Sequence, residues 1–201
     1  MEQYMGMPED LFCEICSEKR GINPDTLKNV IILALEIARE GREGRRIGTM
    51  FVVADTEAVL NHSRSLILDP LQGHPDELRR MEDPNMRETV KELAQLDGAF
   101  IVSDEGIVVS ACRYLDAFSE GIELPLGLGS RHMAAASITK LTNSVAVVVS
   151  ETSIVRILDD GKIVSEIIPE LWMFKRYTAY LGSQGKKLKE QEIAIVSAAA
   201  D

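Results

Sequence analysis

Six short apolar runs are interleaved with segments of helical periodicity, and this alternation constrains the fold more than any other feature of the chain. Two pairs of runs are separated by Asp104-Glu105-Gly106 and Asp159-Asp160-Gly161, which are typical of hairpin turns. Strands and helices in this order favour an α/β (α+β) fold with a mixed central β-sheet flanked by helices. The runs are GTMFVVA (48–54), AFIVS (99–103), IVVSAC (107–112), VAVVVS (145–150), SIVRIL (153–158) and KIVSEII (162–168).

Two segments carry clear helix signals. Asn23 is a candidate N-cap, Pro24 suits the first helical position, and apolar residues then recur at helical spacing until Gly41. This pattern predicts one helix that begins at Pro24 and ends just before Gly41. A second amphipathic helix is expected from about Asn85 to Gln95.

The chain is expected to form one domain with two extensions, because 201 residues suffice for one hydrophobic core. We place that domain at 23–172, after an N-terminal helical extension (1–22) and before a C-terminal extension (173–201). The polar segment 55–84 contains several prolines and glycines and predicts mostly loop with short elements. The chain has no signal-peptide pattern and no apolar run long enough to span a bilayer, so we expect a cytoplasmic protein without a membrane partner.

The charge balance bears on the class of ligand. The formal net charge is −10, whereas a non-specific nucleic-acid binder needs a basic face, so no nucleic-acid partner is expected. A polyanionic ligand would have to be held by a local concentration of positive groups. Cys13, Cys16 and Cys112 fit a reducing compartment, and the CxxC pair offers only half of a zinc site, so we interpret it as small apolar side chains.

The segment GLGSRHMAAASITKLTNS (127–144) is a candidate binding site at the start of a helix. Gly127 and Gly129 allow positive φ, and Ser130 is a candidate N-cap. Free N–H groups and the helix dipole attract anions, and Arg131 and His132 add a bidentate phosphate ligand and a titratable donor or metal ligand. The alternative is a capped helix whose arginine and histidine lie in solvent, and spacing alone slightly favours it.

Two further segments place carboxylates at strand ends. Asp97 precedes an expected strand, and the small residues Gly98 and Ala99 after it leave room above the backbone. Glu151 follows an expected strand, where a side chain at the edge of the sheet can reach a ligand. Such carboxylates can bind a divalent metal or a substrate hydroxyl. Taken alone, each segment is more simply an ordinary turn.

In this order and spacing, the features resemble the diadenylate cyclase domain family, in its archaeal form. That family joins two ATP molecules into cyclic di-AMP and releases pyrophosphate. Its Asp-Gly-Ala turn corresponds to residues 97–99, and its Arg-His-Arg helix start corresponds to Arg131-His132-Met133. The segment VVVSET (147–152) is similar to the family's Val-Ser-Glu-Glu-Thr strand end. The resemblance covers about residues 23–168 and implies a nucleotide-binding catalytic domain.

The resemblance also implies roles for individual residues. Asp97 would act on the ribose 3′-hydroxyl and, with His132 and Glu151, would hold a divalent metal, Mn²⁺ or Mg²⁺. The catalytic set would be Asp97, Gly98, Ala99 and His132. The ATP-binding set would be Tyr114 and Leu115 at the adenine, with Gly129, Ser130, Arg131, His132, Met133, Ser150 and Glu151 at the phosphates.

The expected partners are ATP and a second copy of the chain. The product is two-fold symmetric and the chain has one such constellation, so two protomers with facing sites are expected in a homodimer or higher oligomer. Met133 replaces the second arginine of the family, and Asn143 replaces an aspartate. Because this arginine is missing, an alternative function stays open: a sensor that binds ATP or a cyclic dinucleotide without turnover. An interaction scaffold without a nucleotide site is a third alternative.

Overall fold

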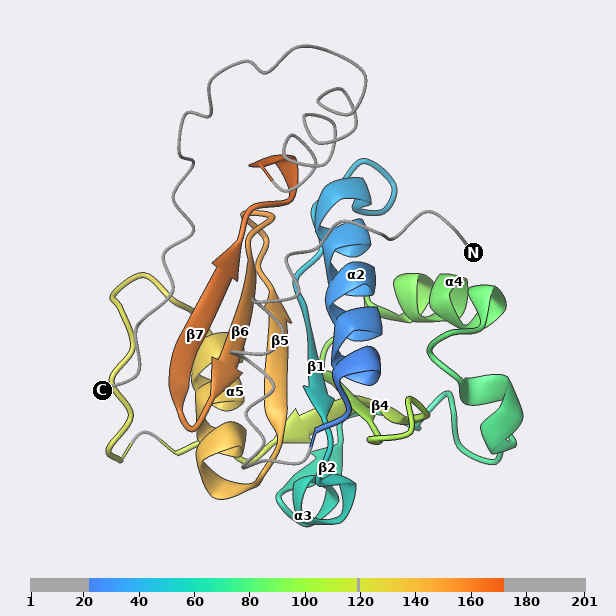
Figure 1. Ribbon diagram of the computed structural model, residues 1–201, viewed down its shortest axis with the longest axis horizontal. Helices are drawn as coiled ribbons and strands as arrows, with labels where there is room; N and C mark the ends of the chain where they lie inside the picture. The colour runs from blue at the N-terminus through green and yellow to red at the C-terminus, as the bar shows by residue number, and fades with distance from the viewer. Residues whose placement is uncertain (1–21, 119, 172–201) are drawn as a thin grey trace.

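The computed structural model describes residues 22–118 and 120–171, which form a seven-stranded sheet covered on both faces by helices (Figure 1). The strand order is β2-β4-β3-β1-β5-β6-β7, in which only the β1–β3 pair is parallel among the pairs of this described sheet. The predicted mixed sheet is confirmed. Its strands are β1 (Thr49–Val53), β2 (Ser63–Ser65), β3 (Ala99–Val102), β4 (Val108–Leu115), β5 (Val145–Val149), β6 (Val155–Asp159) and β7 (Lys162–Ile167). The helices are α2 (Pro24–Glu40), α3 (Thr56–Asn61), the short 3-10 helix η1 (Asp76–Arg79), α4 (Pro84–Leu93) and α5 (Ser130–Leu141).

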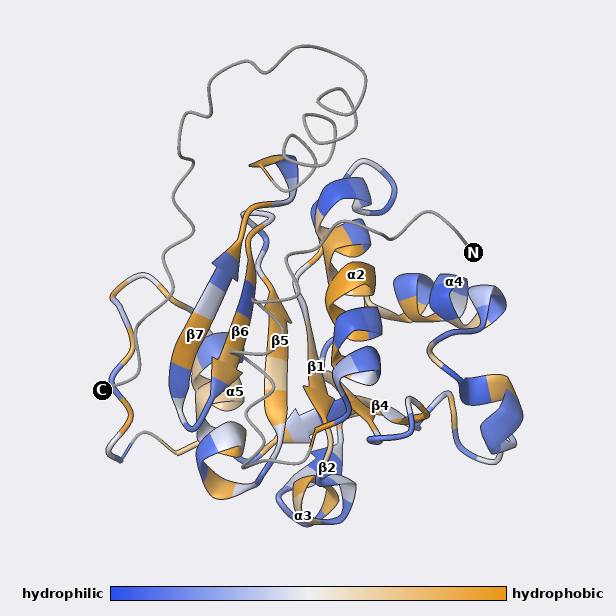
Figure 2. Ribbon diagram, viewed as in Figure 1, coloured by the Kyte–Doolittle hydropathy of each residue, from blue (hydrophilic) through white to orange (hydrophobic). Residues whose placement is uncertain are grey.

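The sheet separates two apolar layers. Helices α2 and α4 pack on one face, and α5 and α3 pack on the other. Along β1, Phe51 and Val53 join the α2 layer, whereas Met50 and Val52 join the α5 layer. Strands that are buried on both faces are mostly apolar, as β1 and β5 are. Figure 2 shows this for β5, whereas α4 is mostly hydrophilic.

Local signals determine where α2 begins and ends. The Asn23 side chain accepts hydrogen bonds from the backbone N–H groups of Asp25 (2.9 Å) and Thr26 (3.4 Å), as an N-cap does. At the other end, Gly41 has a φ of +58° and its N–H donates to the carbonyl of Ile37. The helix predicted from Pro24 to the residue before Gly41 is therefore confirmed.

The strand directions bring three chain segments to one edge of the sheet. Because β1 and β3 are parallel, Gly48 and Gly98, which precede them, lie at the same edge. Because β5 is antiparallel to β1, its last residue Val149 pairs with Thr49, the first residue of β1. The turn after β5, which contains Glu151, therefore lies at this edge as well.

The remaining predictions have different outcomes. The second helix runs over Pro84–Leu93, within two residues of the predicted limits, and 55–84 contains only the short elements α3, β2 and η1. The extension 173–201, all of 1–22 except Ile22, and the pair Cys13 and Cys16 lie outside the described residues. Within 22–118 and 120–171, no helix is long and apolar enough to cross a membrane.

Candidate functional site

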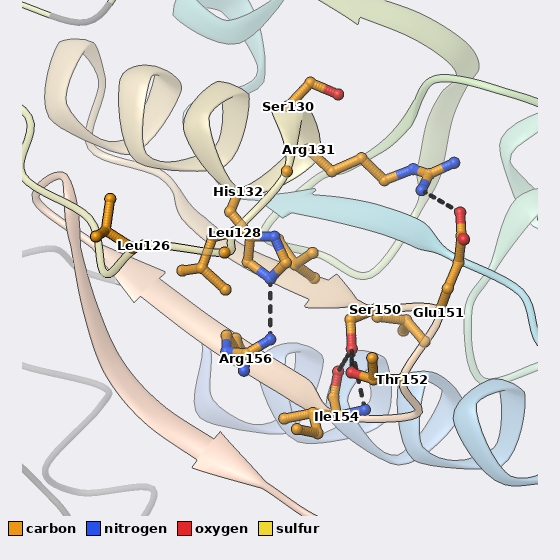
Figure 3. A pocket seen from close by; sticks show the side chains of 14 residues that line it. Leu126, Leu128, Ser130, Arg131, His132, Ser150, Glu151, Thr152, Ile154 and Arg156 are labelled. Carbon is orange, nitrogen blue, oxygen red and sulfur yellow. Dashed lines mark hydrogen bonds and ion pairs between the residues drawn. The ribbon is translucent and has the colours of Figure 1, made fainter.

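A cavity of about 560 Å³ lies between the start of α5 and the turn that joins β5 to β6 (Figure 3). This volume is within the range of cavities that hold small-molecule ligands. Residues from both sides of the cavity were expected to form one site, and the fold brings them together although they are far apart in the sequence. Six of the predicted site residues line it: Gly129, Ser130, Arg131, His132, Ser150 and Glu151.

The start of α5 differs from the prediction in one respect. The N-cap is Gly129, and Ser130 is the first helical residue, so the expectation that Ser130 caps this helix is wrong. Gly129 has no side chain to accept a hydrogen bond from the first turn, and the helix has no side-chain cap. Because Gly129, Ser130 and Arg131 all line the cavity, the uncapped end of the helix dipole faces it. This end favours a negatively charged ligand.

Arg131 joins the two expected carboxylates. Its Nη2 donates to Oδ1 of Asp97 at 3.3 Å, and its Nη1 donates to Oε1 of Glu151 at 3.2 Å. The carboxylate side chains are 86% and 70% exposed, whereas that of Arg131 is only 34% exposed, so a ligand can reach both acids. Glycine at position 48 leaves space for this arrangement, since a Cβ atom there would lie 2.6 Å from Nη1 of Arg131.

Gly98 holds Asp97 at the edge of the sheet. Its φ is +107°, and a Cβ atom would lie 2.6 Å from the carbonyl carbon of Cys112. The backbone of β4 therefore approaches Gly98 closely at a point where the β3–β4 register shifts and Cys112 itself has a positive φ. Both the conformation and the contact require glycine directly after Asp97.

His132 is buried beneath the cavity, with 5% of its surface exposed. Its Nε2 lies 3.2 Å from Nη1 of Arg156 on β6, as Figure 3 shows. A guanidinium only donates, so Nε2 accepts and the remaining ring proton is on Nδ1. Burial lowers the pKa of His132, the positive charges of Arg156 and Arg131 lower it further, and Glu166 partly opposes them. His132 is therefore neutral at neutral pH and does not supply the second positive charge that its position next to Arg131 suggested.

Ser150 closes the turn between β5 and β6. Its Oγ donates to the carbonyl of Ile154 and accepts from the N–H of Ile154, both at 3.1 Å, and it lies 2.7 Å from Oγ1 of Thr152. The simpler interpretation of this segment as a turn is thus correct for Ser150. The same hydrogen bonds orient the turn so that Glu151 extends toward Arg131 (Figure 3).

Other predicted site residues lie outside the lining of the cavity. Ala99 is buried in β3 opposite Arg113, and β4 continues past Arg113 to Tyr114 and Leu115, alongside Gly98. Tyr114 is 42% exposed, whereas Leu115 is buried in the α5 layer. Met133 packs, partly buried, against that same layer.

Sequence reasoning missed two residues. Gly48 matters because of its neighbours Arg131 and Glu151, which no local pattern reveals. Arg156 lines the cavity and contacts His132, and its one sequence signal is a charged residue inside the apolar run SIVRIL.

The donor set at this edge suits a hard divalent cation only in part. Asp97 and Glu151 offer carboxylate oxygens, which Mg²⁺ and Mn²⁺ prefer, and Mg²⁺ commonly binds one or two carboxylates together with substrate phosphates. His132, the expected third ligand, has its Nε2 occupied by Arg156. Within the described part of the chain, no group of three or more His, Cys, Asp or Glu side chains is arranged to hold a metal.

Comparisons with known proteins give consistent results. The family model described as DisA bacterial checkpoint controller nucleotide-binding (DAC) matches residues 36–163, which is more than half of the chain. A diadenylate cyclase of Methanocaldococcus jannaschii is 52% identical over 145 residues, covering 72% of this chain and 46% of that protein. A diadenylate cyclase of Haloferax volcanii is 40% identical over 152 residues, covering 75% of this chain and 55% of that protein. The chain thus spans about half the length of these two curated relatives.

A solved structure shares the fold. The crystal structure described as that of a hypothetical membrane-spanning protein from Bacillus cereus has a TM-score of 0.51 and 19% sequence identity. The match covers 69% of this chain and 62% of that chain. At this level of identity the similarity concerns the fold alone.

Proposed function

The chain belongs to the family described as DisA bacterial checkpoint controller nucleotide-binding, and from this premise we propose that it is a diadenylate cyclase. Such an enzyme condenses two ATP molecules into cyclic di-AMP and pyrophosphate. Two relatives described as diadenylate cyclases are 52% and 40% identical to it. Because the chain spans about half of those relatives, the proposal rests on the site that this chain itself contains.

The position of Arg131 between Asp97 and Glu151 carries the proposal. One guanidinium links two carboxylates that come from opposite sides of β1, and it does so at the mouth of a cavity of about 560 Å³. An isolated helix cap would not need a second and third segment to converge on it. This convergence favours a nucleotide site over the scaffold alternative.

We propose a place for each part of ATP. The triphosphate occupies the cavity against the first turn of α5, where Ser130 and Arg131 offer the helix dipole and a guanidinium. The ribose lies toward Asp97. The adenine lies at Tyr114 and Leu115, which are beside Gly98 on the neighbouring strand.

The proposed reaction is nucleotidyl transfer. The 3′-oxygen of one ATP forms a bond to the α-phosphorus of the other, the bond from that phosphorus to the bridging oxygen of the β-phosphate breaks, and pyrophosphate leaves. Asp97 accepts a hydrogen bond from the attacking hydroxyl, orients it and takes up its proton, and Arg131 interacts with the phosphate charge. The same exchange in the opposite direction closes the ring.

A divalent cation, Mn²⁺ or Mg²⁺, is part of the proposal. Asp97 and Glu151 would hold it together with phosphate oxygens. When bound, such an ion neutralises phosphate charge and stabilises the departing pyrophosphate. His132, whose Nε2 accepts from Arg156, contributes by shaping the wall of the cavity.

We also propose that two protomers act together. The described part of the chain presents one such site, and cyclic di-AMP is two-fold symmetric, so two copies with facing sites complete the reaction. A net charge of −10 opposes the approach of two copies, and bound ATP with its cation would bridge them.

One experiment tests the activity directly. Purified protein is incubated with ATP and either Mg²⁺ or Mn²⁺, and the products are identified by mass. Cyclic di-AMP and pyrophosphate are expected. If neither metal supports any dinucleotide, the cyclase proposal is wrong.

Met133 supports a second candidate, an ATP- or cyclic dinucleotide-binding sensor. Methionine stands where the resemblance calls for arginine, and its side chain packs against the apolar layer. A sensor would bind ATP in calorimetry and return it unchanged from the same incubation.

A further inference from the structure

The cavity has a second arginine, Arg156, on β6. Its neighbours Val155 and Ile157 pack in the α2 layer, so Arg156 points to the opposite face of the sheet, where the cavity and α5 lie. Its side chain is only 11% exposed. Burying a charge between apolar neighbours costs free energy unless partners compensate it, so this position calls for an explanation.

Two side chains hold the Arg156 guanidinium. Its Nε forms an ion pair with Oε1 of Glu166, its register partner on β7, and its Nη1 lies 3.2 Å from Nε2 of His132. A guanidinium has five N–H donors in one plane, and these two contacts use two of them. They fix that plane below the His132 ring, at the cavity wall, as Figure 3 shows.

The charges around the cavity suggest a role for Arg156 in binding an anion. Arg131 is paired with both Asp97 and Glu151, so these three side chains together carry a net charge of −1. The Nε2 of His132 accepts from Arg156, so this side of the ring offers no hydrogen-bond donor to a phosphate. A triphosphate therefore needs a further cation, and Arg156 is placed to be one. Its own carboxylate partner, Glu166, lies on β7 outside the described lining of the cavity.

We propose that Arg156 binds the triphosphate of ATP, with Glu166 and His132 holding its guanidinium in the orientation that presents the free donors to phosphate oxygens. This inference rests on the proposed function, and it adds a substrate-binding residue that neither signature segment contains. A planar fork matches two phosphate oxygens, which a lysine at the same position would not do.

The test compares ATP with adenosine, which lacks phosphates, by calorimetry on the full chain. The variants are Arg156→Met, Arg156→Lys and the control Arg39→Met, which removes the same charge from the surface of α2, where the Arg39 side chain is 47% exposed. In Arg156→Met the Kd for ATP is expected to rise about 10- to 100-fold, because charge-assisted hydrogen bonds are lost. The Kd for adenosine should change by less than about twofold, as a residue that contacts only phosphates predicts. Arg156→Lys should fall between wild type and Arg156→Met, and Arg39→Met should match wild type.

The possible results separate this inference from the proposed function. If wild type binds ATP and Arg156→Met binds it equally well, the inference is overturned while the cyclase proposal stands. Equal weakening of ATP and adenosine would assign Arg156 a structural role only, and this too overturns it. If Arg156→Met does not fold, Arg156→Lys provides the test. ATP binding equal to that of wild type, or equal weakening of ATP and adenosine, would overturn the inference. If wild type binds ATP but forms no cyclic di-AMP, the cyclase proposal is wrong. The contribution of Arg156 to ATP binding can still be measured in that case.

Discussion

Gly48 lies directly against the guanidinium of Arg131: a Cβ atom at Gly48 would be 2.6 Å from Nη1 of Arg131 and 3.1 Å from Cγ of Glu151. The φ of Gly48 is not left-handed, so other residues could adopt its backbone conformation. What glycine provides here is space. The residue that precedes the central strand therefore determines whether an arginine from α5 can reach the carboxylate that follows β5.

The substitution Gly48→Ala should displace Arg131 without unfolding the protein. The nearest atom to the new methyl group is the far end of a flexible side chain, which can move, so we expect the free energy of unfolding to change by less than about 1 kcal/mol. Product formation should fall about 10- to 100-fold, because a small misplacement of a positioning group is costly. The formation of cyclic di-AMP and the thermal midpoint are measured together. The control for product formation is Gly73→Ala, which lies in an open loop with nothing within 4 Å, although its φ of +83° predicts a loss of about 1 kcal/mol in stability. Unchanged product formation in Gly48→Ala would contradict the role assigned to Gly48.

The substitution Gly98→Ala should destabilise the fold itself. It places a methyl group 2.6 Å from backbone carbon of Cys112 at a φ of +107°, and neither strand can move easily. Strain and overpacking together predict a loss of about 2–4 kcal/mol in the free energy of unfolding. Gly44→Ala isolates the conformational part, because Gly44 has a φ of +73° and nothing within 4 Å, and it should cost about 1 kcal/mol. Urea denaturation measures both, and similar losses in the two variants would show that the contact with Cys112 is unimportant.

The substitution Asp97→Asn should separate binding from turnover. The amide keeps the size of the side chain but accepts the hydroxyl hydrogen bond poorly, so cyclic di-AMP formation should fall about 10²- to 10⁴-fold. Asp97 lies outside the cavity lining, so the Kd for ATP measured without a divalent metal should stay within about threefold of wild type. Initial rates and calorimetry measure the two effects. A variant that turns over normally would remove Asp97 from the catalytic set.

His132 should make the stability of the protein depend on pH. Burial and the charges of Arg156 and Arg131 lower its pKa in the folded state, against the opposing effect of Glu166. The folded state therefore binds fewer protons than the unfolded state just below pH 6.5, the ordinary histidine value. The resulting stabilisation is present above pH 6.5 and is lost as the pH falls through the folded pKa. Urea denaturation at pH 7.5 and 5.5 should show a smaller decline for His132→Gln than for wild type, whereas the exposed His62→Gln should decline like wild type.

Local patterns were sufficient to predict α2, α4 and six of the seven strands, because their signals lie within a few residues of one another, whereas no such signal marked α3 and β2. Each of these signals depends on side chains or conformations next to the element. Examples are the N-cap Asn23, the end of α2 at Gly41 and the hairpin turn at Asp159-Asp160-Gly161. The order of the strands does not depend on such local signals, and only the structure reveals it. Ser130 illustrates the limit at an element boundary: Gly129 and Ser130 are both acceptable caps, and the backbone uses the one without a side chain.

The site could be predicted in part. Asp97, Arg131 and Glu151 were identified together only through the combined spacing of their segments. Their ion pairs show that the three side chains lie together, and their roles stay predictions. The neutral state of His132 could not be foreseen, because it depends on burial and on Arg156, 24 residues away. Arg156 in turn acquires its partner Glu166 through the β6–β7 register. Tyr114 and Leu115 stay predictions as adenine contacts, as does the domain boundary at 23–172.

The strand order also sets the span between the two acids. Asp97 precedes β3 and Glu151 follows β5, with β1 between them, so their backbones are separated by two strand spacings, about 9.5 Å. Sheet hydrogen bonds maintain this distance between the two backbones. The lengths of the two side chains then determine the distance between their carboxylate groups. An ion or guanidinium shared by both acids therefore depends on the extra methylene of Glu151, and aspartate at that position would be too short by about one carbon–carbon bond.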